Sequence, residues 1–163
     1  RDSFNTVWYD EDKPLGTGGG LSLLKGKLSS TFFLTNCDLL IFTDYEKLLR
    51  FHRESGSAVT MVCAEKHVTI PYGVVETGES GVITAMQEKP AFQFLTNTGL
   101  YLVEPEVLDD IGEDEVIGFP DIIERQRCRG RRVSAYTVGE EDWLDMGQLD
   151  ELEKMRERLY GKP

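Results

Sequence analysis

Residues 31–63 decide the fold class, and they read TFFLTNCDLLIFTDYEKLLRFHRESGSAVTMVC. The run at 31–35 is rich in β-branched and aromatic residues, which is typical of a strand. A helix is predicted from the capping-box pattern at 43–46 to a glycine stop at Gly56. A second strand-like run follows at 58–63. A strand, a helix and a strand in succession favour a layered α/β domain with a mostly parallel sheet.

The rest of the chain continues this alternation. Further strands are predicted at 6–9, 73–76, 82–87, 99–103 and 133–138, and further helices from Leu21, from Pro105, from Pro120 to Gly130 and from Gln148 to Leu159. The spacing of Val74, Val82 and Gly99 also favours some antiparallel pairing, so we predict a mixed sheet. Residues 1–163 are expected to form one domain.

Composition and charge narrow the function classes. The chain has 163 residues, with 40% hydrophobic and 29% charged residues, which excludes disorder as its main state. No run approaches the ~20 apolar residues of a membrane-spanning helix, and the start does not read as a secretion signal. We therefore expect a cytoplasmic protein. Cys37, Cys63 and Cys128 are odd in number and far apart, which fits neither a disulfide framework nor a cysteine-based zinc site.

The net charge of −11 opposes binding to nucleic acid or to an anionic membrane surface. A phosphate-bearing ligand would therefore need a local holder, such as a placed lysine, backbone amides or a divalent cation.

Two aspartates are candidate catalytic and metal-binding residues. Asp38 ends the strand-like run in Asn36-Cys37-Asp38, and ligands of open α/β sheets bind outside the carboxyl ends of strands. Asp145 lies just before the last predicted helix. Mg²⁺ is typically held by one or two carboxylates together with substrate phosphates, which this pair would suit. The alternatives are a turn-forming role for Asp38 and a capping box between Asp145 and Gln148.

Three other places carry weaker signals. The glycine-rich segment 16–20 could turn backbone amides toward an anion or a base edge, but it has neither Walker A nor dinucleotide spacing and could be a flexible turn. Lys89 in Glu88-Lys89-Pro90 suits a phosphate, or is part of an exposed pair at a strand end. Gly73 and Asn97 stand beside strands, where Gly73 could mark close approach of the backbone to a ligand, although both could belong to simple turns.

The two histidines and one acidic run receive no catalytic role. His52 shares a helical stripe with Leu48 and Leu49, and His67 lies among charged residues. Neither has metal-ligand spacing or an adjacent nucleophile. The run at 140–142 is interpreted as a solvated loop.

Six motifs, taken in chain order, resemble the sugar-phosphate nucleotidyltransferases, also called nucleotide-sugar pyrophosphorylases. They are Pro14-Leu15-Gly16-Thr17-Gly18-Gly19-Gly20-Leu21, Asn36-Cys37-Asp38, Pro71-Tyr72-Gly73-Val74-Val75-Glu76, Glu88-Lys89-Pro90, Asn97-Thr98-Gly99-Leu100-Tyr101 and Trp143-Leu144-Asp145-Met146-Gly147. Together they span nearly the whole chain. The Pro-Leu-Gly-Thr version of the first motif is most similar to the mannose-1-phosphate guanylyltransferase branch.

The resemblance implies a Rossmann-like three-layer domain and a reaction that joins a sugar 1-phosphate to a nucleoside triphosphate, with Mg²⁺ as cofactor and pyrophosphate as the second product. It also implies a role for each matching residue. Gly16 and Thr17 would lie near the nucleobase, Asp38 and Asp145 on Mg²⁺, Gly73, Glu88 and Asn97 near the sugar, and Lys89 near the sugar phosphate. Asp38, Asp145 and Lys89 would be the catalytic residues.

One departure from the family is large. Its members begin with a strand that leads into a Gly-x-Gly-x-Arg-Leu loop and then a Pro-Lys segment, which hold the triphosphate, and neither occurs here. We therefore expect the chain to be the C-terminal part of a catalytic core whose N-terminal strands are missing, and to catalyse no transfer alone. Unpaired sheet edges could also promote homo-oligomers. The main alternative is a noncatalytic, nucleotide-sugar-binding regulatory module.

Overall fold

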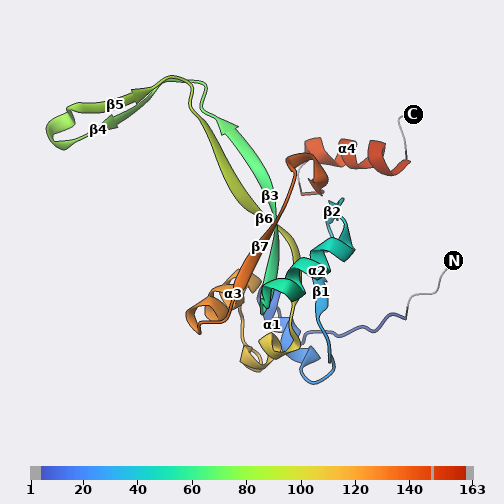
Figure 1. The fold of residues 1–163 in the computed structure, drawn as a ribbon. Helices are drawn as coiled ribbons and strands as arrows, with labels where there is room; N and C mark the ends of the chain where they lie inside the picture. The colour runs from blue at the N-terminus through green and yellow to red at the C-terminus, as the bar shows by residue number, and fades with distance from the viewer. Residues whose placement is uncertain (1–4, 148, 161–163) are drawn as a thin grey trace. The chain divides into compact units, whose positions relative to one another are not determined.

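The computed structural model describes residues 5–147 and 149–160. The chain divides into two compact units (Figure 1). Unit 1 comprises Arg1–Thr35, Asp44–Met61 and Gly99–Tyr136, and unit 2 comprises Asn36–Thr43, Val62–Thr98 and Thr137–Pro163.

Unit 1 contains most of the helices. They are α1 (Gly16–Gly19), α2 (Tyr45–Ser55) and α3 (Phe119–Cys128), with the 3-10 segments η1 (Gly20–Leu24) and η3 (Pro105–Asp110) and strand β1 (Phe32–Thr35). Unit 2 contains β2 (Leu39–Ile41), β4 (Val74–Thr77), β5 (Ile83–Gln87), β8 (Trp143–Asp145), α4 (Leu149–Tyr160) and the 3-10 segments η2 (Glu79–Gly81) and η4 (Glu140–Asp142). Three strands run through both units: β3 (Val59–Thr69), β6 (Ala91–Val103) and β7 (Val133–Val138).

Helix α2 forms as its sequence predicts. The Asp44 carboxylate accepts hydrogen bonds from the backbone N–H groups of Glu46 and Lys47, at 3.1 and 3.0 Å, so Asp44 is the residue that caps the helix. Gly56 ends the helix in the left-handed conformation, with φ of 60°. The predicted stripe is confirmed at Leu48 and His52, both of which are buried.

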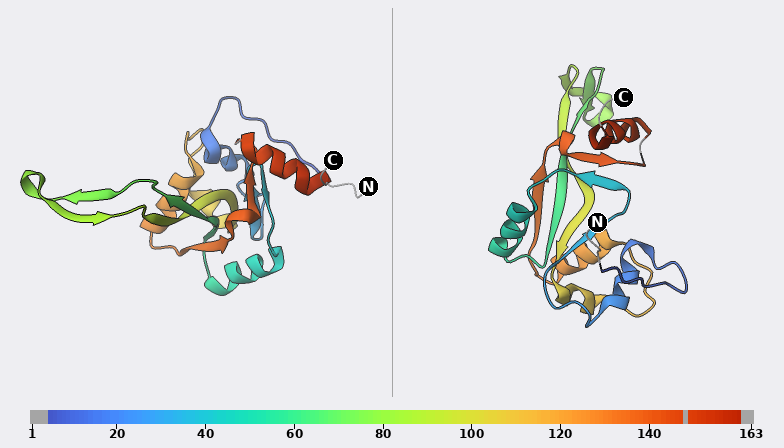
Figure 2. Two further views of the ribbon diagram at one scale, coloured as in Figure 1. Left: turned by 90° about the horizontal axis from the view of Figure 1, so that it is seen from above. Right: turned by 90° about the vertical axis from the view of Figure 1, so that its right-hand side faces the viewer.

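Helices cover both faces of the strands of unit 1, which gives three layers (Figure 2). Neighbouring residues of a strand point to opposite faces. Val59 joins the apolar core on the side of α3, together with Phe119 and Ile122, whereas Thr60 contacts His52 of α2. The α/β class and the Rossmann-like layering predicted from the sequence are therefore confirmed.

The main sheet has the strand order β1-β6-β3-β7 and is mixed, as predicted. Strands β1 and β6 are antiparallel, with Phe32 opposite Val103 and Thr35 opposite Leu100. Strands β3 and β6 form the two arms of a long hairpin and are also antiparallel. At one end Glu104 N–H donates to the Ala58 carbonyl, and at the other Ile70 N–H donates to the Pro90 carbonyl. The described sheet is consequently only partly parallel, not mostly parallel.

Several predicted elements differ in the structure. The expected strand at 6–9 lies outside every sheet, and Trp8 is 84% exposed. Its residue types favour a strand, but a strand also needs a partner for its backbone hydrogen bonds. The helices predicted from Leu21 and from Pro105 are short 3-10 segments. Strands β2 and β8 were not predicted, because three residues are too few to display a period.

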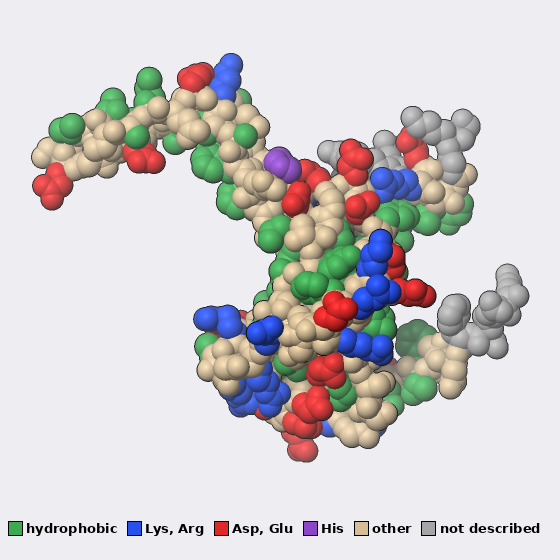
Figure 3. Space-filling model, in the orientation of Figure 1, with side chains coloured by type: hydrophobic (Ala, Val, Ile, Leu, Met, Phe, Trp, Pro, Cys, Tyr) green, Lys and Arg blue, Asp and Glu red, His purple; other side chains and the backbone are tan. Residues whose placement is uncertain are grey.

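Strands β4 and β5 form an antiparallel hairpin that carries several exposed apolar side chains. The register places Val75 opposite Met86 and Thr77 opposite Ile83, and Met86 is 73% exposed. Figure 3 shows hydrophobic side chains along this hairpin. Its antiparallel pairing agrees with the spacing noted in the sequence. Among the described residues, no helix is long and apolar enough to cross a membrane.

Candidate functional site

The two candidate aspartates meet on the ribbon formed by β2 and β8. Leu39 pairs with Asp145, and on the next rung Met146 N–H donates to the Asp38 carbonyl at 2.9 Å. Paired strands lie about 4.8 Å apart, so the backbones of Asp38 and Asp145 are immediate neighbours despite their separation in sequence. All of this ribbon belongs to unit 2.

The side chains of this pair have different surroundings. Asp145 is half-buried, and its Oδ1 accepts the backbone N–H of Gly147 at 2.9 Å, which restrains the carboxylate. Asp38 is exposed in the bend before β2, and its carboxylate forms no hydrogen bond or ion pair within the described residues. The alternative capping box of Asp145 requires Gln148, which lies outside the described residues.

The donor set of the ribbon fits a hard divalent cation. Carboxylate oxygens are the ligands that Mg²⁺ and Ca²⁺ take, and Mg²⁺ in particular binds through one or two carboxylates while substrate phosphates and water complete its shell. The part of the chain that the structure describes holds no group of three or more His, Cys, Asp or Glu that could bind a metal without such help. Two carboxylates by themselves would leave most of the shell of such an ion to phosphate oxygens and water.

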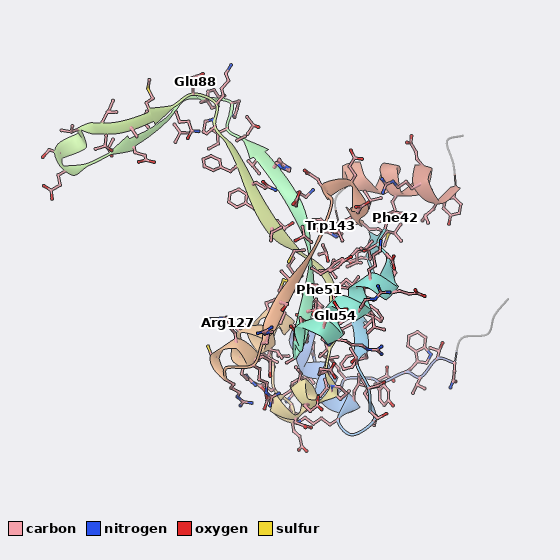
Figure 4. The ribbon with its side chains drawn as sticks, viewed as in Figure 1. Phe42, Phe51, Glu54, Glu88, Arg127 and Trp143 are labelled. Atoms are coloured by element: carbon pink, nitrogen blue, oxygen red, sulfur yellow. The ribbon has the colours of Figure 1, made fainter. Side chains whose placement is uncertain are left out.

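Gly73, Glu88 and Lys89 come together at the base of the β4–β5 hairpin, also within unit 2. Lys89 N–H donates to the Tyr72 carbonyl at 3.3 Å, which sets the two chains side by side. The Glu88 carboxylate lies across Gly73, where a Cβ would be 3.0 Å from Glu88 Oε2. Figure 4 labels Glu88 at this position. The absence of a side chain at Gly73 thus leaves room for Glu88.

Lys89 has an unusual backbone conformation. Its φ is 44°, in the left-handed region that a residue with a side chain rarely adopts. The exposed Lys89 ammonium forms no ion pair in the described part of the chain. An unpaired cation in such a turn can serve as a phosphate-binding group.

The structure does not place Lys89 beside the two aspartates. On β3, Lys66 contacts Glu140, which lies just before β8 and therefore close in sequence to Asp145. Tyr72, whose carbonyl accepts the Lys89 N–H, lies six residues after Lys66 in the chain. Six residues of extended chain span about 20 Å. The hairpin base and the carboxylate ribbon are therefore two separate groups of predicted site residues.

Asn97 belongs with the ribbon side rather than with the hairpin base. It lies in β6, three residues before Leu100, and Leu100 forms the last pair of the β1–β6 ladder with Thr35. Asp38 follows Thr35 by three residues. The segments that contain Asn97 and Asp38 therefore both leave the ladder at its Thr35–Leu100 end. The exposed Asn97 is about 20 Å of strand away from Ala91, where β6 begins.

Gly16 and Thr17, the predicted nucleobase contacts, lie in unit 1 and support helix α3. The Thr17 hydroxyl accepts the backbone N–H of Phe119 at 3.0 Å, and Gly18 N–H donates to the Ile117 carbonyl at 3.0 Å. A Cβ on Gly18 would lie 2.6 Å from Ile122 Cδ1. Close packing against the start of α3 thus accounts for Gly18, and close approach to the carbonyls of Ile117 and Glu115 accounts for Gly16 and Gly19, all within the short helix α1.

A buried polar cluster around His52 escaped the sequence reasoning. Its Nδ1 lies 2.8 Å from the Thr60 hydroxyl, and its Nε2 lies 2.9 Å from Glu104 Oε1, which also accepts the Thr31 hydroxyl at 2.6 Å. The cluster borders a cavity of about 510 Å³ in unit 1 whose wall includes Arg53 and Arg131. The one sign of this cluster in the sequence is that His52 lies on a helical stripe whose other members are leucines.

The run at 140–142 forms the 3-10 segment η4, which leads into β8, and its two glutamates are exposed, as a solvated segment requires. Glu140 contacts His67 Nδ1 at 3.4 Å and Lys66 Nζ at 3.3 Å, and these two neighbours hold the pKa of the Glu140 carboxyl below its ordinary value. Lys66 Nζ also lies 5.3 Å from the centre of the Trp143 ring. Nothing in the local sequence indicates these contacts, because they join residues far apart in the chain.

Comparison with known proteins matches this chain to one family. The nucleotidyl transferase family matches over residues 6–160. The chain is 33% identical over 154 residues to the mannose-1-phosphate guanylyltransferase catalytic subunit beta of Drosophila pseudoobscura pseudoobscura, covering 87% of the chain and 39% of that protein. It is 32% identical over 152 residues to the UTP–glucose-1-phosphate uridylyltransferase of a Synechocystis species, covering 84% of the chain and 38% of that protein.

Solved structures agree on the fold. The chain is similar to HddC from Yersinia pseudotuberculosis, with a TM-score of 0.64 and 20% identity over 91% of this chain and 64% of that one. HddC has also been solved in complex with GMP-PN. The chain thus spans about two fifths of the length of the curated relatives described above. Because the family match covers nearly all of the chain, this protein belongs to the nucleotidyl transferase family.

Proposed function

We propose that this chain supplies the metal-holding and sugar-phosphate-binding part of an enzyme that joins a sugar 1-phosphate to a nucleoside triphosphate. The observation that carries the proposal is the pairing of β2 with β8, which brings Asp38 and Asp145 to adjacent rungs of one ribbon. An exposed carboxylate whose backbone adjoins that of a restrained one supplies oxygen ligands of the kind that Mg²⁺ takes together with phosphates.

The proposed reaction is a displacement at phosphorus. A phosphate oxygen of the sugar 1-phosphate forms a bond to the α-phosphorus of the nucleotide, and the bond to the pyrophosphate oxygen breaks. A protein accelerates such a reaction mainly by aligning the reactants and by neutralising charge. The net charge of −11 makes local neutralisation necessary for two phosphorylated substrates.

Each predicted residue then has a defined task. Asp38 and Asp145 hold Mg²⁺, which when bound neutralises charge on the reacting phosphates. Lys89 pairs with the sugar phosphate, and Glu88 accepts hydrogen bonds from sugar hydroxyls at the position that Gly73 leaves open. Asn97 contacts the sugar from the ribbon side, and Gly16 and Thr17 present backbone groups to the base.

Mannose 1-phosphate with GTP is the first substrate pair to test, and glucose 1-phosphate with UTP is the second. The names of the relatives support this order, and the GMP-PN complex of HddC supports a guanine nucleotide. Because the Gly-x-Gly-x-Arg-Leu loop does not occur in the sequence, we expect no turnover from the 163-residue chain alone.

The test is pyrophosphate release, with Mg²⁺, by a full-length protein that contains this chain. Asp38→Asn and Asp145→Asn are each expected to lower kcat by roughly a hundredfold or more, because charge neutralisation is lost. Asp109→Asn is the matched control, since Asp109 is an exposed aspartate of unit 1. Turnover near that of the unmodified protein in both site variants would return the two aspartates to turn and cap roles. Tight binding of a nucleotide sugar without any turnover by the unmodified protein would favour the regulatory module.

A further inference from the structure

We propose that Lys66 is a positioning residue that holds strand β8, and with it Asp145, in place. The inference rests on the proposed function for its catalytic meaning, but the contacts that carry it are independent of any substrate. All of them lie within unit 2.

Lys66 joins two successive pieces of the chain that lead to Asp145. Its Nζ lies 3.3 Å from Glu140 Oε1, at the start of η4, and 5.3 Å from the ring centre of Trp143, the first residue of β8. The Lys66 side chain is only 28% exposed. A cation over the face of an indole ring is attracted to it, and partial removal from water strengthens that attraction.

The Trp143 ring has no other described polar group to orient it. Its Nε1 is buried and has no hydrogen-bond partner among the described residues. The backbone around it is fixed by different groups: Phe42 N–H donates to the Asp142 carbonyl at 2.8 Å, and Arg158 donates to the Glu141 carbonyl at 2.6 Å. Among the described residues, Lys66 is thus the polar group that contacts the Trp143 ring, whereas Phe42 and Arg158 bind the backbone just before it.

Trp143 can transmit this contact to Asp145. The two residues are second neighbours in a strand of three, so their side chains leave the same face of the ribbon. Because β8 has only three residues, few backbone hydrogen bonds hold it in place when the Trp143 side chain changes position. Removal of the Lys66 charge should therefore change the orientation of the Asp145 carboxylate without unfolding unit 2.

The primary test is nuclear magnetic resonance of the 163-residue chain carrying Lys66→Met, which keeps the length of the side chain and removes its charge. We expect the Trp143 indole N–H signal, the Asp145 carboxyl ¹³C signal and the Gly147 amide signal to move. Lys66→Arg should restore all three, because arginine keeps the cation over the ring. Lys47→Met is the matched control, since Lys47 pairs only with Asp44 at the start of α2 in the described residues and should leave these signals unchanged.

A second measurement links this placement to catalysis. In an active full-length protein, Lys66→Met should lower kcat about tenfold while KM for the sugar phosphate stays within about twofold, because Lys66 does not touch the sugar site. Unchanged Asp145 and Gly147 signals in Lys66→Met would overturn the inference whether or not the protein is an enzyme. Moved signals in a full-length protein that never turns over would support the positioning contact and refute the proposed function.

Discussion

Replacement of His52 by leucine should destabilise unit 1 by removing both polar partners of a buried ring. His52 is 1% exposed, and its two nitrogens contact the Thr60 hydroxyl and the Glu104 carboxylate. Leucine has a similar volume, so the loss is mainly of hydrogen bonds. Thr60 is fully buried, and a buried hydroxyl without a partner costs about 1–3 kcal/mol. Glu104 is 35% exposed on its side chain and keeps the Thr31 hydroxyl, so water can replace part of its loss.

The free energy of unfolding should therefore fall by about 2–4 kcal/mol in His52→Leu, with most of the loss assigned to Thr60. The double variant His52→Leu with Thr60→Val should recover about 1–2 kcal/mol, because both members of the polar pair are then apolar. Urea unfolding followed by circular dichroism measures these differences. Hydrogen exchange at the amides of β3 and α2 assigns them to unit 1, because the two units can open separately.

The double-variant cycle also gives the result that would refute this reasoning. If Thr60→Val lowers the free energy of unfolding by the same amount with His52 and with leucine present, the two side chains are not coupled. A His52→Leu protein within about 0.5 kcal/mol of the unmodified one would likewise show that the cluster does not stabilise the fold.

Two further predictions concern the start of helix α3 and its surroundings. The Arg125 guanidinium holds the pKa of the Glu115 carboxyl at about 2, against an ordinary 4.5, through a hydrogen bond of 2.6 Å. Because the folded state has the lower pKa, the contribution of this pair to stability is present above about pH 4.5 and is lost as the pH falls toward 2. A ¹³C titration of the Glu115 carboxyl should show this pKa, and Arg125→Gln should raise it; an equal pKa in both proteins would contradict the assignment. Thr17→Val should lower the free energy of unfolding by about 1 kcal/mol, measured with urea, because the Phe119 N–H loses its acceptor. Thr17→Ser keeps the oxygen and serves as the control. Equal stability of the two variants would show that the Thr17 hydroxyl does not stabilise the start of α3.

Local sequence signals predicted those elements in which the decisive interactions lie within a few residues of each other. The Asp44 side chain accepts hydrogen bonds from the N–H groups of Glu46 and Lys47 in the first turn of α2, and Gly56 supplies the left-handed conformation that ends it. Strand β7 has the bounds that its pattern predicts, and the β4–β5 hairpin follows from the spacing of its apolar residues. Such signals depend on backbone propensity and side-chain period, both of which are local.

Elements that depend on a distant partner could not be predicted in this way. The residues at 6–9 have the composition of a strand, yet no neighbouring chain in the described residues pairs with them. Strands β2 and β8 have three residues each, and they are strands because they pair with one another. The sequence left the glycines at 16–20 open as an anion-facing or a flexible turn, whereas the structure shows Gly18 packed against α3 and Gly16 and Gly19 packed against the carbonyls of Ile117 and Glu115.

The same distinction between local signals and long-range contacts applies to the candidate site. Asp38, Glu88 and Lys89 could be selected from the sequence because each follows a predicted strand, and Asp145 because it precedes the last predicted helix. The motifs that contain them indicated the family that the match over residues 6–160 shows. Only the tertiary structure decided that Asp38 and Asp145 share one ribbon, that Lys89 lies on a separate hairpin base, and that Lys66 contacts Trp143. The physical reason is that residue type records which chemistry a side chain can perform, while proximity between distant positions arises from strand pairing and packing of the whole chain.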